Sequence, residues 1–176
     1  PGHTDLAGFA IGIVDKPKVI DHSSVSAGDI VLGLASNGLH SNGFTLINKL
    51  IDLGKLSSDE ASIKSMLAPT RLYVRSIVRL CEELGTGAEG VKACAHITGG
   101  GLLENIARVI PDGLAAKLSR KSWKEHPLFG VVRDAAGLPD DEMDRTFNMG
   151  VGFVVVVPAA NVNKAEVILG EAGEVV

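Results

Sequence analysis

The sequence predicts a single α/β domain in which helices pack on a mixed β-sheet. Apolar runs occur at residues 6–14, 30–35 and 153–157, and such runs are typical of strands buried in a sheet. Segments with apolar residues at helical spacing lie between these runs. A chain of 176 residues is long enough for one well-buried core, and no repeat or linker divides it. We therefore treat residues 1–176 as one domain.

The first elements are two strands and a helix. The run LAGFAIGIV at residues 6–14 predicts a strand buried on both faces, and residues 19–25 predict a short edge strand. The run IVLGLA at residues 30–35 predicts a second strong strand. Residues 44–53 then predict a helix, because apolar side chains recur at the spacing of one helix face, at Phe44, Ile47, Leu50 and Ile51.

The middle of the chain predicts a polar connection and a long helix. Residues 54–67 have room for one short helical turn. Pro69 favours the start of a helix over residues 70–84, with an apolar stripe of Leu72, Tyr73, Ile77, Leu80, Cys81 and Leu84. A row of arginines lies along a different stripe, and we expect it to face solvent; it consists of Arg71, Arg75 and Arg79.

The second half repeats the alternation of strand and helix. Residues 114–118 predict a strand and residues 128–135 a helix. Residues 153–157, FVVVV, are the most strand-like segment of the chain, and residues 162–172 predict a last helix. We expect the only tryptophan, Trp123, to anchor a packed corner.

The stretch AHITGGGLLENIAR at residues 95–108 is the strongest candidate for a ligand site. An apolar run rises to Thr98, passes through Gly99, Gly100 and Gly101, and turns at once into a helical pattern. Glycines let a backbone approach an anion closely, and the first N–H groups of the following helix point at it. The pattern indicates a phosphate site, with a tight turn or a close packing contact as the alternative.

The loop SNGLHSNG at residues 36–43 is the second candidate. It is rich in hydrogen-bonding side chains and follows the carboxyl end of a strand, where open α/β sheets bind ligands. The alternative is a turn in which the two Asn-Gly pairs supply positive φ and Ser41 caps the next helix. His40 is the candidate general acid or base of this loop, with a hydrogen-bonded anchor as its alternative role.

Acidic residues and cysteines predict no metal site and no disulfide. The acidic run at residues 140–144 suits a helix N-terminus, and no oxygen-rich ligand loop accompanies it. Cys81 and Cys94 belong to no CxxC motif or Cys/His cluster, so we expect two buried, reduced thiols.

Charge and hydropathy exclude two classes of partner. The net charge of −4 argues against nucleic acid and against an anionic membrane surface, because both demand a basic face. No apolar run approaches the roughly 18 residues of a membrane-spanning helix. We expect a soluble cytoplasmic protein whose partner is a small molecule.

Three stretches stand out together: ASNGLHSNGF at residues 35–44, HITGGGLLENIARVIP at residues 96–111, and RTFNMGVGFVVVVP at residues 145–158. APTRLYV at residues 68–74 and DLAGFAIGIV at residues 5–14 accompany them. In this order they closely resemble the C-terminal half of the aminoimidazole ribonucleotide synthetase family, also called phosphoribosylformylglycinamidine cyclo-ligases. The resemblance covers essentially the whole chain.

The resemblance implies a step of de novo purine biosynthesis, in which ATP drives closure of the imidazole ring of formylglycinamidine ribonucleotide. Its implied chemistry is phosphoryl transfer to the formyl oxygen and attack of the amidine nitrogen, which depends on positioning and charge stabilisation. The TGGG loop, residues 98–101, would bind the 5′-phosphate. The loop at residues 36–43, called the HSNG loop after its residues 40–43, would line the same cleft. The substrate-binding residues implied in this way are His40, Ser41, Asn42, Gly43, Thr98, Gly99, Gly100, Gly101, Asn105 and Asn148.

The resemblance also implies that ATP and Mg²⁺ are bound mainly by an N-terminal domain, which forms the family's homodimer. The chain begins at Pro1 and ends at residues 174–176, EVV, where a strand pattern begins after Gly173, so we expect the substrate-side part of a longer protein, inactive alone. Two other interpretations stay open. One is a related ATP-dependent synthetase, such as the amidotransferase of the preceding purine step, and the other is a non-catalytic module that binds a phospho-ligand.

Overall fold

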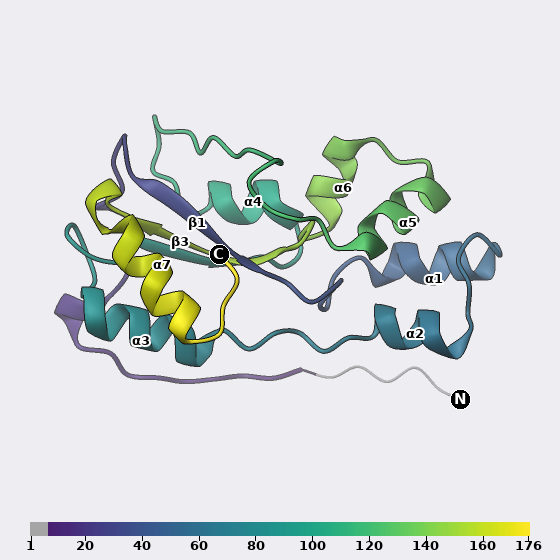
Figure 1. The fold of residues 1–176 in the computed structure, drawn as a ribbon, viewed down its shortest axis with the longest axis horizontal. Coiled ribbons are helices and arrows are strands. Elements are labelled where there is room, and N and C mark those ends of the chain that lie inside the picture. Colours follow the sequence, from purple (N-terminus) through teal and green to yellow (C-terminus); the bar gives the residue numbers. More distant parts are fainter. Residues whose placement is uncertain (1–6) are drawn as a thin grey trace.

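The computed structural model describes residues 7–176 and centres on a three-stranded sheet (Figure 1). β3 lies in the middle and runs antiparallel to both neighbours, with Leu32 opposite Val155. The α/β class is confirmed, and so are the strands expected at residues 30–35 and 153–157. The sheet is antiparallel where a mixed sheet was expected, because β3 opposes each strand it pairs with. In spatial order, the strands are β1 (Ile30–Ala35), β3 (Val151–Val157) and β2 (Ala93–His96).

Helices cover both faces of this sheet. α3 (Val74–Leu84) and α7 (Val162–Glu171) lie on one face, and α4 (Gly101–Ala107) lies on the other (Figure 1). Alternation along β3 produces the two layers, since successive side chains of a strand point to opposite faces. Val154 packs into the apolar cluster that contains α4, whereas Val155 packs into the cluster that contains α3 and α7.

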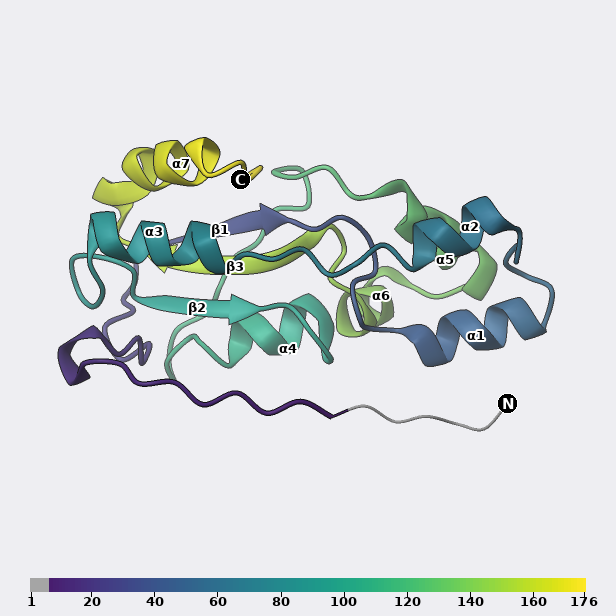
Figure 2. The same cartoon turned by 90° about the horizontal axis from the view of Figure 1, so that it is seen from below.

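The remaining helices gather at one end of the sheet (Figures 1 and 2). The helices expected at residues 44–53 and 128–135 are confirmed. The second begins with Pro127 in its first turn and ends before Gly137, whose φ of 66° gives a left-handed cap. These helices are α1 (Phe44–Asp52), α2 (Glu60–Met66), α5 (Pro127–Ala136) and α6 (Asp140–Thr146), and two 3-10 turns, η1 (Lys16–Lys18) and η2 (Ala159–Asn161), complete the described elements.

The N-terminal segment departs most from expectation. Residues 7–14 pair with no strand of the described chain, and the side chains of Phe9, Ile11 and Ile13 are 97%, 100% and 102% exposed. Leu6, where the expected strand starts, lies outside the described residues. A strand buried on both faces needs paired neighbours and two apolar covers. Residues 7–176 supply neither, and Figure 2 shows the segment running outside β2.

Two further expected strands are wrong. Residues 19–25 form turns, because Asp21 accepts a hydrogen bond from the backbone N–H of Ser23 and so competes with a ladder. Residues 114–118 are irregular, and the N–H of Leu114 turns back to the carbonyl of Pro111. Both expectations rested on local apolar pattern alone.

The helix expected at residues 70–84 begins only at Val74. The preceding residues bond instead to the loop that follows β1, as described below. The expected solvent-facing arginine row is correspondingly broken. Arg75 is exposed, but Arg71 is half-buried and pairs with Glu174 at 3.0 Å.

Three smaller expectations concern the tryptophan, the cysteines and membrane spans. Trp123 anchors a corner, since its Nε1 donates to the carbonyl of Met149 at 2.9 Å. Cys81 and Cys94 are free thiols, but each is half-buried rather than buried as expected, and burial raises the pKa of Cys94 to about 12. In the described chain, every helix is too short or too polar to cross a membrane.

Candidate functional site

The topology brings three sequence motifs to one edge of the sheet. β1 and β2 both run antiparallel to β3, so their carboxyl ends lie at the edge where β3 begins. The HSNG loop follows β1, the TGGG loop follows β2, and residues 145–150 lead into β3. Motifs far apart in the sequence are therefore neighbours.

Two motif glycines are required by packing between these segments. A Cβ at Gly43 would overlap the ring of Phe147, with Cζ only 2.7 Å away. A Cβ at Gly101 would lie 2.8 Å from the carbonyl carbons of Asp144 and Arg145 in α6. For Gly101 the geometry supports the packing alternative, and Gly43, at φ 78°, has the positive φ expected of the Asn-Gly turn as well as a close packing contact.

Asn148 ties the HSNG loop to the start of β3. It is 1% exposed. Its Oδ1 accepts hydrogen bonds from Ser36 Oγ at 2.8 Å and from the N–H of Gly150 at 2.9 Å. Its Nδ2 donates to the carbonyl of Gly38 at 2.9 Å and, at 3.3 Å, to that of Leu39. These bonds use the whole amide, so Asn148 shapes the loop from within and has little surface to offer a ligand.

The TGGG loop presents backbone N–H groups outward. Gly99 is exposed and Gly100 half-buried. Within residues 7–176, neither of their N–H groups has a hydrogen-bond partner. Gly99 also faces the neighbouring loop, since a Cβ built on it would have Asn42 Oδ1, 3.9 Å away, as its nearest neighbour. Backbone N–H groups without a protein partner are donors of the kind that anion-binding loops use.

Asn105 lies beneath this loop. It is 5% exposed, and its Nδ2 lies 3.2, 3.1 and 2.8 Å from the carbonyl oxygens of Thr98, Gly99 and Gly101. The sequence placed Asn105 among the contacts of the ligand. In the structure its amide nitrogen is turned toward the loop carbonyls.

His40 is buried, neutral and constrained. Its φ of 58° is left-handed, and its side chain is 4% exposed. Nε2 accepts from the N–H groups of Asn37 and Arg71, each at 3.4 Å, while Nδ1 is buried without a partner among the described residues. Burial, then the nearby His96 and Arg71, lower the pKa of His40 to about 4. A neutral ring accepting at Nε2 carries its proton on Nδ1, which fits the anchor role better than proton transfer.

The segment at residues 69–71, part of the APTRLYV stretch for which the sequence predicted no site residue, packs against the site. The Nδ2 of Asn37 donates to the carbonyl of Pro69 at 2.9 Å, and the hydroxyls of Ser41 and Thr70 lie 3.0 Å apart. With the bond from Arg71 to His40, these contacts hold residues 69–71 extended against the HSNG loop. Ser41 therefore bonds across to this segment rather than capping α1, whose N-cap is Gly43.

The sequence also did not predict that Tyr73, His96 and Phe153 form an aromatic group beside His40. Tyr73 donates its hydroxyl to the carbonyl of Ala35 at 2.8 Å, and burial raises its pKa. The rings of His96 and Phe153 stack with centroids 6.0 Å apart, and both line an apolar groove of about 350 Å³ that also contains Thr70. The sequence signal was the position of His96, at the end of the strand that leads into TGGG.

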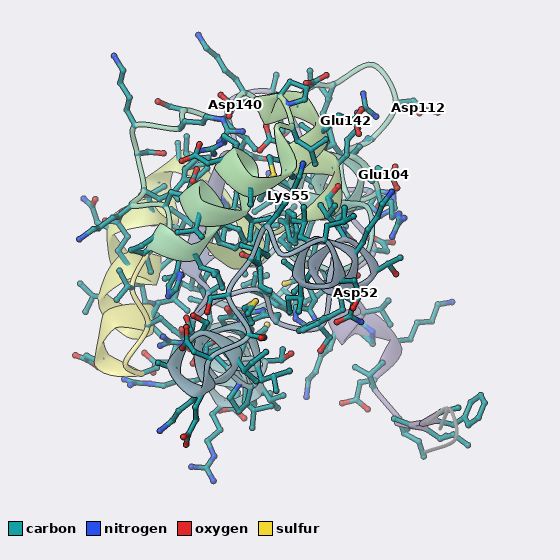
Figure 3. The ribbon with its side chains drawn as sticks, turned by 90° about the vertical axis from the view of Figure 1, so that its right-hand side faces the viewer. Asp52, Lys55, Glu104, Asp112, Asp140 and Glu142 are labelled. Carbon is teal, nitrogen blue, oxygen red and sulfur yellow. The ribbon has the colours of Figure 1, made fainter. Side chains whose placement is uncertain are left out.

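The carboxylates of the acidic helix α6 do not gather into a metal-ligand cluster. No group of three potential His, Cys, Asp or Glu ligands occurs in the described chain. Figure 3 shows Asp140 and Glu142 standing apart from Asp112 and Glu104 rather than converging. Asp140, Asp141 and Glu142 occupy the first turn of α6, where negative charge favours the helix dipole.

Comparisons with known proteins identify a family for this chain. Residues 26–176 match the model of the family described as "AIR synthase related protein, C-terminal domain". The chain is 48% identical to the phosphoribosylformylglycinamidine cyclo-ligase of Burkholderia pseudomallei (strain 1710b), over 98% of this chain and 49% of the relative. Identity to the same enzyme of Burkholderia cenocepacia (strain HI2424) is 47% over the same shares. The chain thus spans about half the length of the curated relatives it matches.

Proposed function

The chain belongs to the family of AIR synthase related protein C-terminal domains, and we propose that it is the substrate-side half of a phosphoribosylformylglycinamidine cyclo-ligase. The proposed reaction of the longer protein is ATP-dependent closure of the imidazole ring of formylglycinamidine ribonucleotide. In this division, the present chain binds and orients the nucleotide, and the TGGG loop holds its 5′-phosphate.

One observation carries this assignment. The N–H groups of Gly99 and Gly100 face outward beside Asn42. Backbone N–H groups hydrogen-bond phosphate oxygens without the cost of ordering a long side chain. α4 has only 7 residues, so the loop and not the helix dipole is proposed as the phosphate site. Ser41 and Asn42, on the adjacent loop, supply hydroxyl and amide groups suited to a ribose.

The loops do not fit Mg²⁺-ATP. The polar side chains of the SNGLHSNG and TGGG loops are amide, hydroxyl and imidazole groups, whereas Mg²⁺ prefers carboxylate and phosphate oxygens. We propose that ATP, Mg²⁺ and the homodimer contacts belong to the remainder of the longer protein. The exposed segment at residues 7–14 fits this division, because its apolar side chains need a cover that residues 7–176 lack. We also propose a cytoplasmic location, where purine precursors are made.

Calorimetric titration tests the proposal. The chain is titrated with formylglycinamidine ribonucleotide and, separately, with Mg²⁺-ATP, and Gly99→Asp is compared with Gly99→Ala. Gly99 suits the test because its φ is not left-handed and its Cβ position is open, whereas a Cβ at Gly100, at φ 93°, would lie 2.8 Å from Cβ of Glu104. A carboxylate at Gly99 would repel a phosphate, while the methyl of Ala would not.

We expect the chain to bind the nucleotide and not Mg²⁺-ATP. Gly99→Asp should weaken nucleotide binding by about tenfold or more, and Gly99→Ala by much less. Equal affinity of Gly99→Asp and the parent chain for the nucleotide would exclude the TGGG loop as the phosphate site. Binding of Mg²⁺-ATP in place of the nucleotide would contradict the assignment of this half to the substrate.

A further inference from the structure

The side chain of Asn105 reaches the inner side of the TGGG loop. Its Nδ2 donates toward three carbonyls, those of Thr98, Gly99 and Gly101, at 3.2, 3.1 and 2.8 Å. Its Oδ1 accepts from Thr98 Oγ1 and from Arg108 Nη1, each at 3.3 Å. Two donors on one side and carbonyls on the other fix which way the amide faces, because only the nitrogen carries hydrogens to give.

Because these loop carbonyls point inward to Asn105, the geometry of the peptide unit makes the N–H groups that follow them point outward. In a trans peptide unit the C=O and the following N–H point in opposite directions, and every peptide bond of the described chain is trans. The carbonyl of Thr98 shares its plane with the N–H of Gly99, and the carbonyl of Gly99 shares its plane with the N–H of Gly100. Turning both carbonyls toward Asn105 therefore turns both N–H groups away from it.

We propose that Asn105 is a positioning residue for phosphate: it holds the TGGG loop so that the N–H groups of Gly99 and Gly100 face the ligand, and it does not touch the ligand itself. This inference rests on the proposed function. Burial supports it, since Asn105 is 5% exposed and its amide hydrogens are already engaged. The glycines permit this backbone conformation of the TGGG loop, and the hydrogen bonds from Asn105 stabilise it.

The test separates the phosphate from the rest of the ligand. Dissociation constants are measured by calorimetry for formylglycinamidine ribonucleotide and for its dephosphorylated ribonucleoside. The ribonucleoside constant divided by the ribonucleotide constant gives the contribution of the phosphate to affinity. Asn105→Leu removes both donors while keeping the volume. Ser76→Ala is the matched control, because Ser76 is also buried and hydrogen-bonded, to Glu174, but lies in α3 on the opposite face of the sheet.

We expect Asn105→Leu to reduce the ratio by about tenfold or more and to leave ribonucleoside affinity unchanged. Ser76→Ala should lower stability and leave the ratio unchanged. A parental ratio retained in folded Asn105→Leu would overturn the positioning role. If Asn105→Leu keeps the parental ratio while Gly99→Asp loses the contribution of the phosphate, only the role of Asn105 fails. If the parent chain itself shows no contribution from phosphate, the proposed function fails with it.

A measurement on the parent chain covers the case in which Asn105→Leu does not fold. Nuclear magnetic resonance follows the side-chain NH₂ of Asn105 and the amides of Gly99 and Gly100 during titration with the ribonucleotide. The glycine amides should shift strongly, and the NH₂ signals should stay nearly in place. Large shifts of the NH₂ signals with little change at the glycines would overturn the proposal, because they would make Asn105 the direct contact.

Discussion

Gly43 lies against the aromatic ring of Phe147, so closely that any side chain at Gly43 would occupy the space of the ring. Gly43 ends the HSNG loop, and Phe147 precedes β3 as a fully buried side chain. The contact fixes how the loop sits on the segment that leads into the central strand. Loss of this fit would displace the other loop residues together.

Gly43→Ala should destabilise the chain by about 3 kcal/mol, from overpacking against Phe147 and from a left-handed φ of 78°. Gly170→Ala is the control, since Gly170 lies in α7 with no atom within 4 Å of its Cβ position. That change should be neutral or stabilise by up to about 1 kcal/mol. Urea unfolding measures both, and equal effects would refute the packing constraint.

Asn148→Ala should loosen the HSNG loop without opening the sheet. The substitution leaves the carbonyl of Gly38 and the N–H of Gly150 without their partner, at a cost of about 1 to 3 kcal/mol. Hydrogen exchange at the Gly150 amide should become faster, while exchange within the β1 and β3 ladder changes no more than global stability requires. Unchanged protection at Gly150 would show that Asn148 does not hold this segment.

His40 should make the chain less stable in mild acid. Its folded pKa of about 4 lies below its ordinary value of 6.5, so the unfolded chain binds the proton more readily. The contribution is complete well above pH 6.5 and is lost as the pH falls toward 4, by about 2.5 kcal/mol at pH 4.5. Urea unfolding at pH 7 and 4.5 measures the loss.

His40→Asn provides the comparison, because asparagine tolerates the left-handed φ of 58° and does not titrate. It should lose less stability than the parent chain between the two pH values. Identical losses would mean that His40 titrates normally in the folded chain.

Glu174 should matter far more than a surface partner of similar chemistry. Its side chain is 3% exposed and pairs with Arg71, whereas Glu83 is 40% exposed where it pairs with Arg79. Glu174→Ala leaves Arg71 half-buried without its carboxylate and should cost about 2 to 4 kcal/mol. Glu83→Ala should cost less than about 1 kcal/mol. Thermal unfolding compares them, and similar losses would contradict the difference in burial.

Local pattern predicted most elements of this fold. The strands β1 and β3 and the helices α1, α5 and α7 follow from periodicity and turn residues that act within a few positions. Residues 70–73 could not be predicted in this way. Their helical pattern is overridden by bonds to His40 and to the hydroxyl of Ser41, partners that only the tertiary structure brings close. Residues 7–14 show the opposite case, a strand pattern without its neighbours in the described chain.

The sequence predicted where the residues of the candidate site lie, but not which of them face outward and which pack inside. The glycines and polar side chains of the two loops meet at one sheet edge, as strand order requires. Sequence could not distinguish Gly99, which has open space, from Gly101, which is packed against α6. It also could not show that Asn105 and Asn148 turn inward, since their partners are backbone carbonyls that carry no sequence signature.

A crystal structure of the chain with formylglycinamidine ribonucleotide tests the central claim most directly. We predict phosphate oxygens about 3 Å from the backbone nitrogens of Gly99 and Gly100, with Nδ2 of Asn105 still on the loop carbonyls. A nucleotide whose phosphate lies away from the TGGG loop, with the N–H groups of Gly99 and Gly100 in contact with solvent alone, would contradict it.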